Sequence, residues 1–196
     1  MSKAKRKLRP IPKLIITVFV LFIVFLFFLG IWDTFFRASH YPMAYKEEIT
    51  AACEEFGIDV ETVFATIYCE SSFNKEAVSN MNARGLMQLL PDTFEWLCTR
   101  EGVEYDEEML FDPATNIRYG TMFLSILYDR YENWDAVHAA YHAGHGRVDG
   151  WFESGEVIID ADGNLTGIPI DATSVYVERI NSAKKVYTEL LAKEKK

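Results

Sequence analysis

The chain has 196 residues, 49% of them hydrophobic, and a formal net charge of −9 at pH 7. This length suits one compact domain with its own hydrophobic core. Once the six basic residues of the N-terminus are set aside, 14 Lys and Arg face 29 Asp and Glu. This balance argues against nucleic acid as a partner, because phosphates require a basic surface.

The N-terminus combines a basic segment with an apolar one. Residues 1–13 contain no acid, and residues 14–32 are uncharged and almost entirely Leu, Ile, Val and Phe. An apolar run of this length can span the hydrocarbon core, and the preceding basic residues predict a cytoplasmic N-terminus. A cleaved signal peptide is the alternative, but Gly30-Ile31-Trp32 is a poor cleavage site. We therefore expect a cytoplasmic segment over 1–13, one transmembrane helix over 14–32, a linker over 33–42 and an external domain over 43–196.

The rest of the chain carries a series of amphipathic helical patterns. Asp59, Asn133 and Asp112-Pro113 are typical helix starts, while Gly57 and Gly144 are typical ends. An acidic surface loop is expected over residues 101–110, and turn signals over residues 151–167 predict a small β-hairpin. The predicted fold class is thus mainly α, with helices over 43–56, 60–70, 91–100, 113–131 and 134–143 and a last one opened by Asp171 or Thr173.

Glu70 lies in the last turn of the second predicted helix, beside Val63 and Ile67 at the edge of the apolar face. Partial burial and the negative end of the helix dipole both raise a carboxyl pKa. A carboxylic acid that stays protonated near neutral pH can protonate a glycosidic oxygen. An ordinary solvated acid at a helix end is the alternative.

Cysteine and histidine patterns leave alternatives open. Cys53 and Cys69 lie on adjacent predicted helices and could pair, or they could be buried with Cys98 as small apolar side chains. His138 and His142 are four residues apart on one predicted helix, with His145 after them, which is a spacing found in zinc sites. No Glu stands between the first two, so a metalloprotease base is missing. We expect no metal and no cofactor.

Four sequence strings, spread in order over residues 45–190, resemble the soluble lytic transglycosylase family, which is related to goose-type lysozyme. The first string is Glu70-Ser71, Phe73-Asn74, Ser79 and Gly85-Leu86-Met87-Gln88-Leu89 before Pro91. The second is Asp112-Pro113 with Asn116-Ile117 and Gly120. The third is Ala139-Ala140-Tyr141-His142-Ala143-Gly144. The closing string is Ile168-Pro169 with Thr173 and Tyr176-Val177.

This resemblance implies a lysozyme-like helical fold and a bacterial enzyme with Glu70 as its single general acid/base. Such enzymes cleave the β-1,4 bond between N-acetylmuramic acid and N-acetylglucosamine in peptidoglycan, leaving 1,6-anhydro ends. The expected partners are glycan strands, the membrane through the N-terminal helix, and a protein complex of the cell envelope. The implied substrate-binding residues are Ser79, Met87, Gln88, Leu90, Tyr141 and His142. A turn-forming role for Ser79, and core positions for Met87 and Leu90, are the alternatives.

The chain departs from the family at three positions. His142 stands in place of the usual Asn, His145 in place of the usual Pro, and Ala172 in place of a Glu that touches sugar. Asp171 is the candidate replacement for that Glu. A lysozyme-type muramidase and a catalytically silent peptidoglycan-binding module are the competing functions. The silent module is disfavoured, because binding alone does not need the acid.

Overall fold

The computed structural model describes residues 15–28 and 40–194, and the chain divides into two units, residues 1–41 and 42–196. In the first unit, residues 15–28 are helical and expose most of their large apolar side chains. Across the described residues, no helix has both the length and the apolar character needed to cross a membrane. The predicted basic segment, both ends of the predicted span and most of the predicted linker lie outside the described residues, so these assignments stay predictions.

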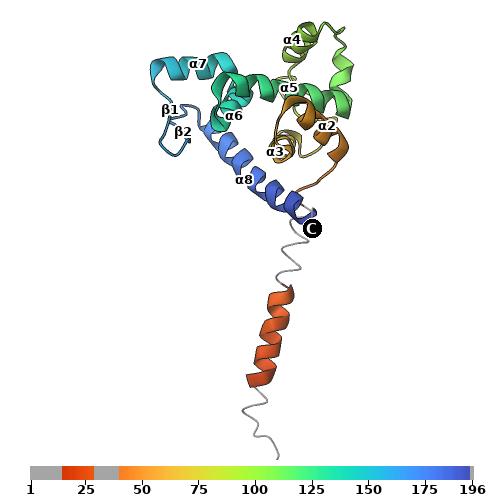
Figure 1. The fold of residues 1–196 in the computed structure, drawn as a ribbon, viewed down its shortest axis with the longest axis vertical. Helices are drawn as coiled ribbons and strands as arrows, with labels where there is room; N and C mark the ends of the chain where they lie inside the picture. Colours follow the sequence, from red (N-terminus) through yellow and green to blue (C-terminus); the bar gives the residue numbers. More distant parts are fainter. Residues whose placement is uncertain (1–14, 29–39, 195–196) are drawn as a thin grey trace, which may run out of the picture. The chain divides into compact units, whose positions relative to one another are not determined.

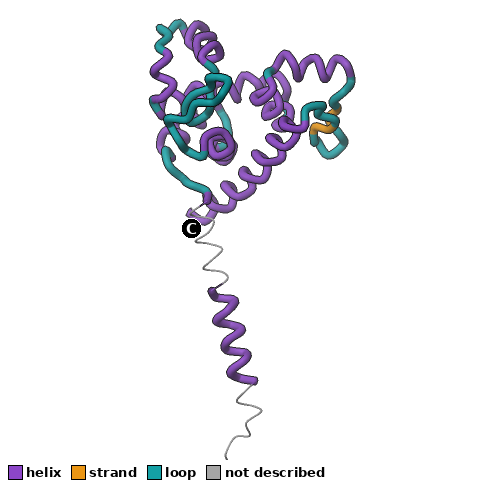
Figure 2. Tube along the Cα trace, turned by 180° about the vertical axis from the view of Figure 1, so that it is seen from behind, coloured by secondary structure: helices purple, strands orange, loops and turns teal. Residues whose placement is uncertain are grey.

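The second unit is a helical domain with one small hairpin, as the sequence predicts (Figure 1). The strands lie together at one edge of the domain (Figure 2), and they pair antiparallel with Ile158 opposite Thr166. The elements are α2 (Lys46–Phe56), α3 (Val60–Ser71), α4 (Pro91–Glu101), η1 (Glu107–Phe111), α5 (Pro113–Tyr131), α6 (Trp134–Ala143), α7 (His145–Ser154), β1 (Ile158–Ile159), β2 (Leu165–Thr166) and α8 (Asp171–Glu194).

Helix α5 is the central element of the domain and packs against α2, α4, α6 and η1. Its start is fixed by the Asp112 side chain, which accepts a hydrogen bond from the Thr115 N–H at 2.9 Å. Gly120 lets the loop after α3 pack against it, since a Cβ there would lie 2.4 Å from Met87 Sδ. Helix α8 packs against α3 and α6 and so brings the C-terminal part of the chain to the end of α3.

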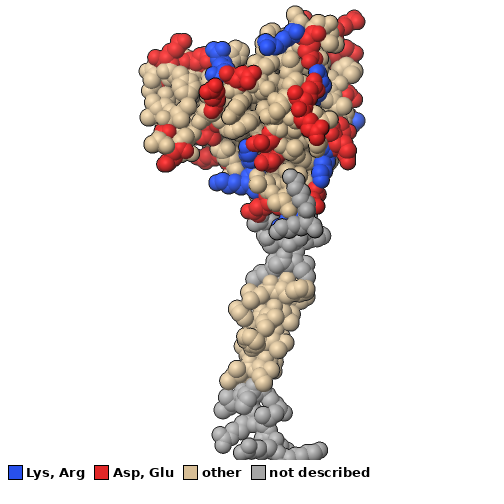
Figure 3. Space-filling model, in the orientation of Figure 1, with Lys and Arg blue, Asp and Glu red and all other residues tan. Residues whose placement is uncertain are grey.

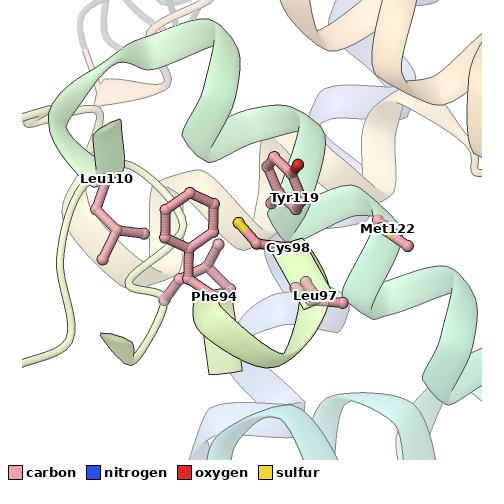
Figure 4. Packing of buried hydrophobic residues seen from close by; sticks show 7 residues of the cluster. Phe94, Leu97, Cys98, Leu110, Tyr119 and Met122 are labelled. Atoms are coloured by element: carbon pink, nitrogen blue, oxygen red, sulfur yellow. The ribbon is translucent and has the colours of Figure 1, made fainter. Parts of the chain in front are cut away.

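The α4 region forms an apolar cluster with η1 and α5 (Figure 4). It comprises Leu89, Phe94, Leu97, Cys98, Leu110, Tyr119 and Met122. The prediction of a surface loop over residues 101–110 is therefore wrong in its second half. The Asp106 side chain caps the 3-10 helix by accepting from the Glu108 N–H at 3.1 Å, and the turn buries Leu110 completely.

Helix α7, like η1, is absent from the elements that the sequence patterns predict. Gly146 and Gly150 weaken its helical pattern, yet Val148 and Trp151, three residues apart, are both buried against the domain. The predicted hairpin over residues 151–167 is accordingly too long at its start. At the N-terminal side, helix α2 begins at Lys46 rather than at residue 43, because Tyr45 has a left-handed backbone with φ 59°.

Charged side chains are spread over the surface of the domain, with acidic ones prominent on the face shown in Figure 3. Arg118 of α5 pairs with Glu55 of α2 and with Glu101 of α4, at 2.5 and 2.7 Å. Such partly exposed pairs add little to stability. They join α2 and α4 to α5 across the surface of the domain.

Candidate active site

Glu70 occupies the last turn of α3, as the sequence predicts, and lies partly buried where the chain leaves the helix. Ser72 ends the helix in a left-handed conformation with φ 51°. Ser71 Oγ donates to the Leu86 carbonyl at 2.8 Å, which fastens the following loop to the end of the helix. Burial raises the pKa of Glu70 to about 7, against the opposing effects of a hydrogen bond from Tyr176 and the charge of Arg179. The carboxyl group is thus protonated in a large fraction of molecules near neutral pH.

Tyr176 of α8 holds this carboxyl group. Its hydroxyl donates to Glu70 Oε1, and its side chain is only 5% exposed. The imidazole of His142 stacks on the Tyr176 ring with centroids 4.5 Å apart and an interplanar angle of 28°. The ring nitrogen Nδ1 of His142 lies 3.1 Å from Thr173 Oγ1, which also belongs to α8. Three helices, α3, α6 and α8, therefore meet at the acid.

The loop between α3 and α4 is organised by a buried side chain of α5. Asn116 Oδ1 accepts from the Met87 N–H at 2.7 Å, and Nδ2 donates to the Leu110 and Arg84 carbonyls at 2.8 and 3.0 Å. Gly85 permits this approach, since it has φ +77° and a Cβ there would lie 2.2 Å from the Leu110 carbonyl oxygen. The apolar turn of the first sequence motif is thus built around one amide.

Two of the predicted substrate-binding residues stabilise this loop from within. Ser79 Oγ accepts from the Met81 and Ala83 N–H groups at 3.2 and 3.0 Å, which is the turn-forming arrangement. Gln88 Nε2 donates to the carbonyls of Ala77 and Gly85 at 3.0 Å each.

The other residues predicted to bind substrate lie partly in the core and partly at the surface. Tyr141 Oη donates to the Met87 carbonyl at 2.8 Å, while the Met87 side chain is fully buried. Leu90 is 42% exposed at the start of α4. Burial and the charge of Glu70 together raise the pKa of Tyr141, so this hydroxyl remains protonated beside the acid.

Sequence analysis gave no role to Tyr176 or Asn116, although both stand within the recognised strings. Tyr176 lies 106 residues after Glu70, and no local spacing pairs them. Asn116 carried a weak signal, because an amide beside Ile117 on a buried helical face needs hydrogen-bond partners.

The cysteines and His138 lie in buried or partly buried surroundings, and the cysteines form no disulfide. Cys53, Cys69 and Cys98 are all free thiols, and burial raises the pKa of Cys53 to about 12 and that of Cys69 to about 11. His138 is fully buried with its ring 5.6 Å from that of Trp134, and burial lowers its pKa to about 3. In the described part of the chain, no three His, Cys, Asp or Glu side chains gather to hold a metal ion.

An apolar depression of about 450 Å³ lies between α4, α5 and the start of α7. Its lining includes Trp96, which is 45% exposed, and Phe123. The Trp96 and Phe123 rings are 6.5 Å apart, and the Phe123 and Tyr141 rings 5.4 Å apart. This row of aromatic rings connects the depression with the residues around Glu70.

Comparison with known proteins gives consistent similarities. Residues 47–157 match the family described as Transglycosylase SLT domain. The chain is 34% identical over 165 residues to a putative soluble lytic murein transglycosylase of Haemophilus influenzae, covering 83% of this chain and 28% of the relative. It is 31% identical over 156 residues to membrane-bound lytic murein transglycosylase C of Glaesserella parasuis, covering 68% of this chain and 43% of the relative.

Solved structures of two lytic transglycosylases share the fold. The 70 kDa soluble lytic transglycosylase of Escherichia coli superposes with a TM-score of 0.73 at 28% identity, over 83% of this chain and 26% of that one. An inactive mutant of the lytic transglycosylase Slt of Pseudomonas aeruginosa gives 0.71 at 30% identity, over 78% and 25%. The chain thus spans about a quarter of the length of these two enzymes, and under half that of the relative from Glaesserella parasuis.

Proposed function

The chain belongs to the transglycosylase SLT domain family, and from this premise we propose that it is a membrane-anchored lytic transglycosylase of bacterial peptidoglycan. The proposed substrate bond is the β-1,4 link between N-acetylmuramic acid and N-acetylglucosamine. The observation that carries the proposal is the position of Glu70 at the end of α3, where burial raises its pKa to about 7. A general acid with a pKa near the working pH is the group that this bond cleavage requires.

The proposed reaction uses Glu70 twice. The protonated carboxyl first gives its proton to the glycosidic oxygen as the bond from that oxygen to C1 of the muramyl ring breaks. The resulting carboxylate then takes the proton of the muramyl 6-hydroxyl as O6 bonds to C1, which closes the 1,6-anhydro ring and restores the acid. The muramyl 6-hydroxyl can react faster than water because it is held beside C1 at high effective molarity.

A single carboxylate distinguishes this scheme from the two-carboxylate glycosidase mechanisms. Apart from burial, the groups of the described residues that shift the pKa of Glu70 are Tyr176 and Arg179, and neither is an acid that could serve as a second carboxylate. The Tyr176 hydroxyl can donate to Glu70 whether the carboxyl group is protonated or ionised. It would stabilise the carboxylate that exists between the two steps. This supports the transglycosylase over the hydrolase, since hydrolysis by these mechanisms needs a second carboxylate as nucleophile or as base for water.

The glycan is proposed to lie along the row of rings that leads from Tyr141 to Trp96. Aromatic faces offer the apolar surface on which sugar rings pack, and carbohydrate sites are usually concave with a few polar groups. Leu90 and His142 are exposed enough to touch the strand. Ser79 and Gln88 would act on the substrate through the shape of the loop that they hold.

Products distinguish the three candidate functions. The full-length chain in detergent, incubated with purified sacculi in heavy-oxygen water, is expected to release muropeptides with 1,6-anhydromuramyl ends and no incorporated heavy oxygen. Mass spectrometry measures both features. Reducing ends that carry heavy oxygen would identify a lysozyme-type muramidase instead, and binding without release would identify a silent module.

Membrane anchoring is proposed from the apolar run over 14–32 and the basic segment before it. The name of the membrane-bound relative from Glaesserella parasuis agrees with it. Protease added to intact spheroplasts is expected to digest the domain, because the positive N-terminus stays inside. A domain that resists protease in intact spheroplasts but not in lysed ones would contradict this orientation.

A further inference from the structure

We propose that His142 is a positioning residue, which in its neutral form holds Tyr176 against Glu70 and in its protonated form loosens that hold and lowers activity. The inference rests on the proposed function, because it concerns how Glu70 is kept ready to donate a proton. The family usually has Asn at this position, so the device belongs to this chain. It follows from three contacts, two that join α6 to α8 and one that joins α8 to α3.

The first argument is geometric. The His142 ring covers the Tyr176 ring at 4.5 Å between centroids, and the hydroxyl of that same ring is the hydrogen-bond donor to Glu70. A tyrosine hydroxyl follows the tilt of its ring, so a group packed on the ring face sets the direction of the hydrogen bond. Within residues 40–194, the aromatic ring that stacks on Tyr176 is that of His142.

The second argument concerns how His142 is itself oriented. Its Nδ1 lies 3.1 Å from the hydroxyl of Thr173, which is 1% exposed and one turn before Tyr176 on α8. In neutral imidazole Nδ1 can accept from this hydroxyl while Nε2 carries the proton. Protonation turns Nδ1 into a donor, so the proton of the buried Thr173 hydroxyl must leave this contact. The ring position therefore depends on the protonation state.

The third argument is electrostatic. Charged and titratable groups face His142 from two helices: Tyr176 and Arg179 from α8 and, through Tyr176, Glu70 and Cys69 from α3. Burial and the positive charge of Arg179 both lower the pKa of His142, while burial raises that of Glu70. The pair therefore keeps its one shared proton on Glu70. A second proton goes to His142 and places positive charge beside the Tyr176 ring, while Glu70 keeps its own proton. The loss of activity then comes from the changed hold on Tyr176.

The test compares pH profiles of kcat/KM on glycan strands for the full-length chain and its variants. The unaltered chain is expected to lose activity at high pH as Glu70 ionises and at low pH as His142 is protonated. His142→Phe keeps a ring on Tyr176 but cannot titrate, so the acid limb should disappear while the alkaline limb stays. His142→Asn removes the ring as well. It should also lower kcat on the order of 10-fold, within the cost of a small misplacement.

Thr173 supplies an independent check. Thr173→Ser keeps the hydroxyl and should retain the profile of the unaltered chain, while Thr173→Val is nearly isosteric and should move the acid limb. His145→Asn, which removes an exposed histidine from the start of α7, should leave the acid limb in place. An acid limb that is unmoved in His142→Phe, His142→Asn and Thr173→Val would overturn the inference. If the unaltered chain releases no anhydro products, the proposed function fails instead.

Discussion

Glu70→Gln is expected to lower turnover on peptidoglycan by at least about 10²-fold, the usual scale for losing general acid–base catalysis. Glutamine has nearly the same shape, and its amide oxygen can still accept from the Tyr176 hydroxyl. It can neither give a proton to the glycosidic oxygen nor take one from the 6-hydroxyl. Glycan binding should therefore survive while release of products stops.

The same substitution should make the folded domain more stable at pH 8. Burial raises the pKa of Glu70 from 4.5 to about 7, so the folded chain keeps a proton that the unfolded chain has released. Stability therefore falls as the pH rises from 4.5 to 7 and stays reduced above that range. The upper bound of this cost is roughly 3 kcal/mol, and Gln does not incur it.

Two measurements on one variant thus move in opposite directions, and a misfolded variant cannot produce that result. Product release is measured by mass spectrometry, and the free energy of unfolding by urea titration at pH 5 and pH 8. Glu76→Gln is the matched control, because Glu76 is an exposed acid in the next loop. It should leave both quantities close to those of the unaltered chain. Full activity of Glu70→Gln would refute both the transglycosylase and the lysozyme.

The features that could be predicted from the sequence are those that local spacing determines. Val63 and Ile67 place Glu70 on the edge of an apolar helical face, and Asp112 with Pro113 marks the start of α5. Both follow from the 3.6-residue period and from capping chemistry. The raised pKa of Glu70 was predictable for the same reason, because the apolar residues Ile67 and Val63, one and two helical turns before Glu70, already indicated that this side of the helix is buried.

The features that could not be predicted depend on contacts between distant segments. Nothing near Tyr176 indicates that its hydroxyl reaches the end of α3, and nothing near His142 indicates which ring it covers. Ser79 and Gln88 were assigned to the substrate by the family resemblance, while their hydrogen bonds to the loop backbone depend on the fold. Helix α7 was missed because glycine lowers helix propensity, yet burial of Val148 and Trp151 outweighs that loss.

Asn116→Ala is expected to destabilise the domain by about 3–5 kcal/mol. The substitution leaves two buried groups, the Met87 N–H and the Leu110 carbonyl, without this partner, while the Arg84 carbonyl keeps the Leu89 N–H at 3.1 Å. Each unpaired buried polar group costs about 1–3 kcal/mol, and water entering the space left by the amide would recover part of that cost. Urea unfolding should show a lower midpoint with an unchanged slope.

Asn80→Ala is the matched control for this prediction, because Asn80 is an exposed asparagine in the same loop. Its effect should stay within about 0.5 kcal/mol, as for most surface substitutions. Asn116→Ala should also lower activity. Asn116 holds the Met87 backbone through its N–H, and the carbonyl of the same residue accepts from the Tyr141 hydroxyl. Asn116 therefore links the core of α5 to the residues beside Glu70. A loss below about 1 kcal/mol with full activity would mean that Ser71 and Gln88 suffice to hold the loop.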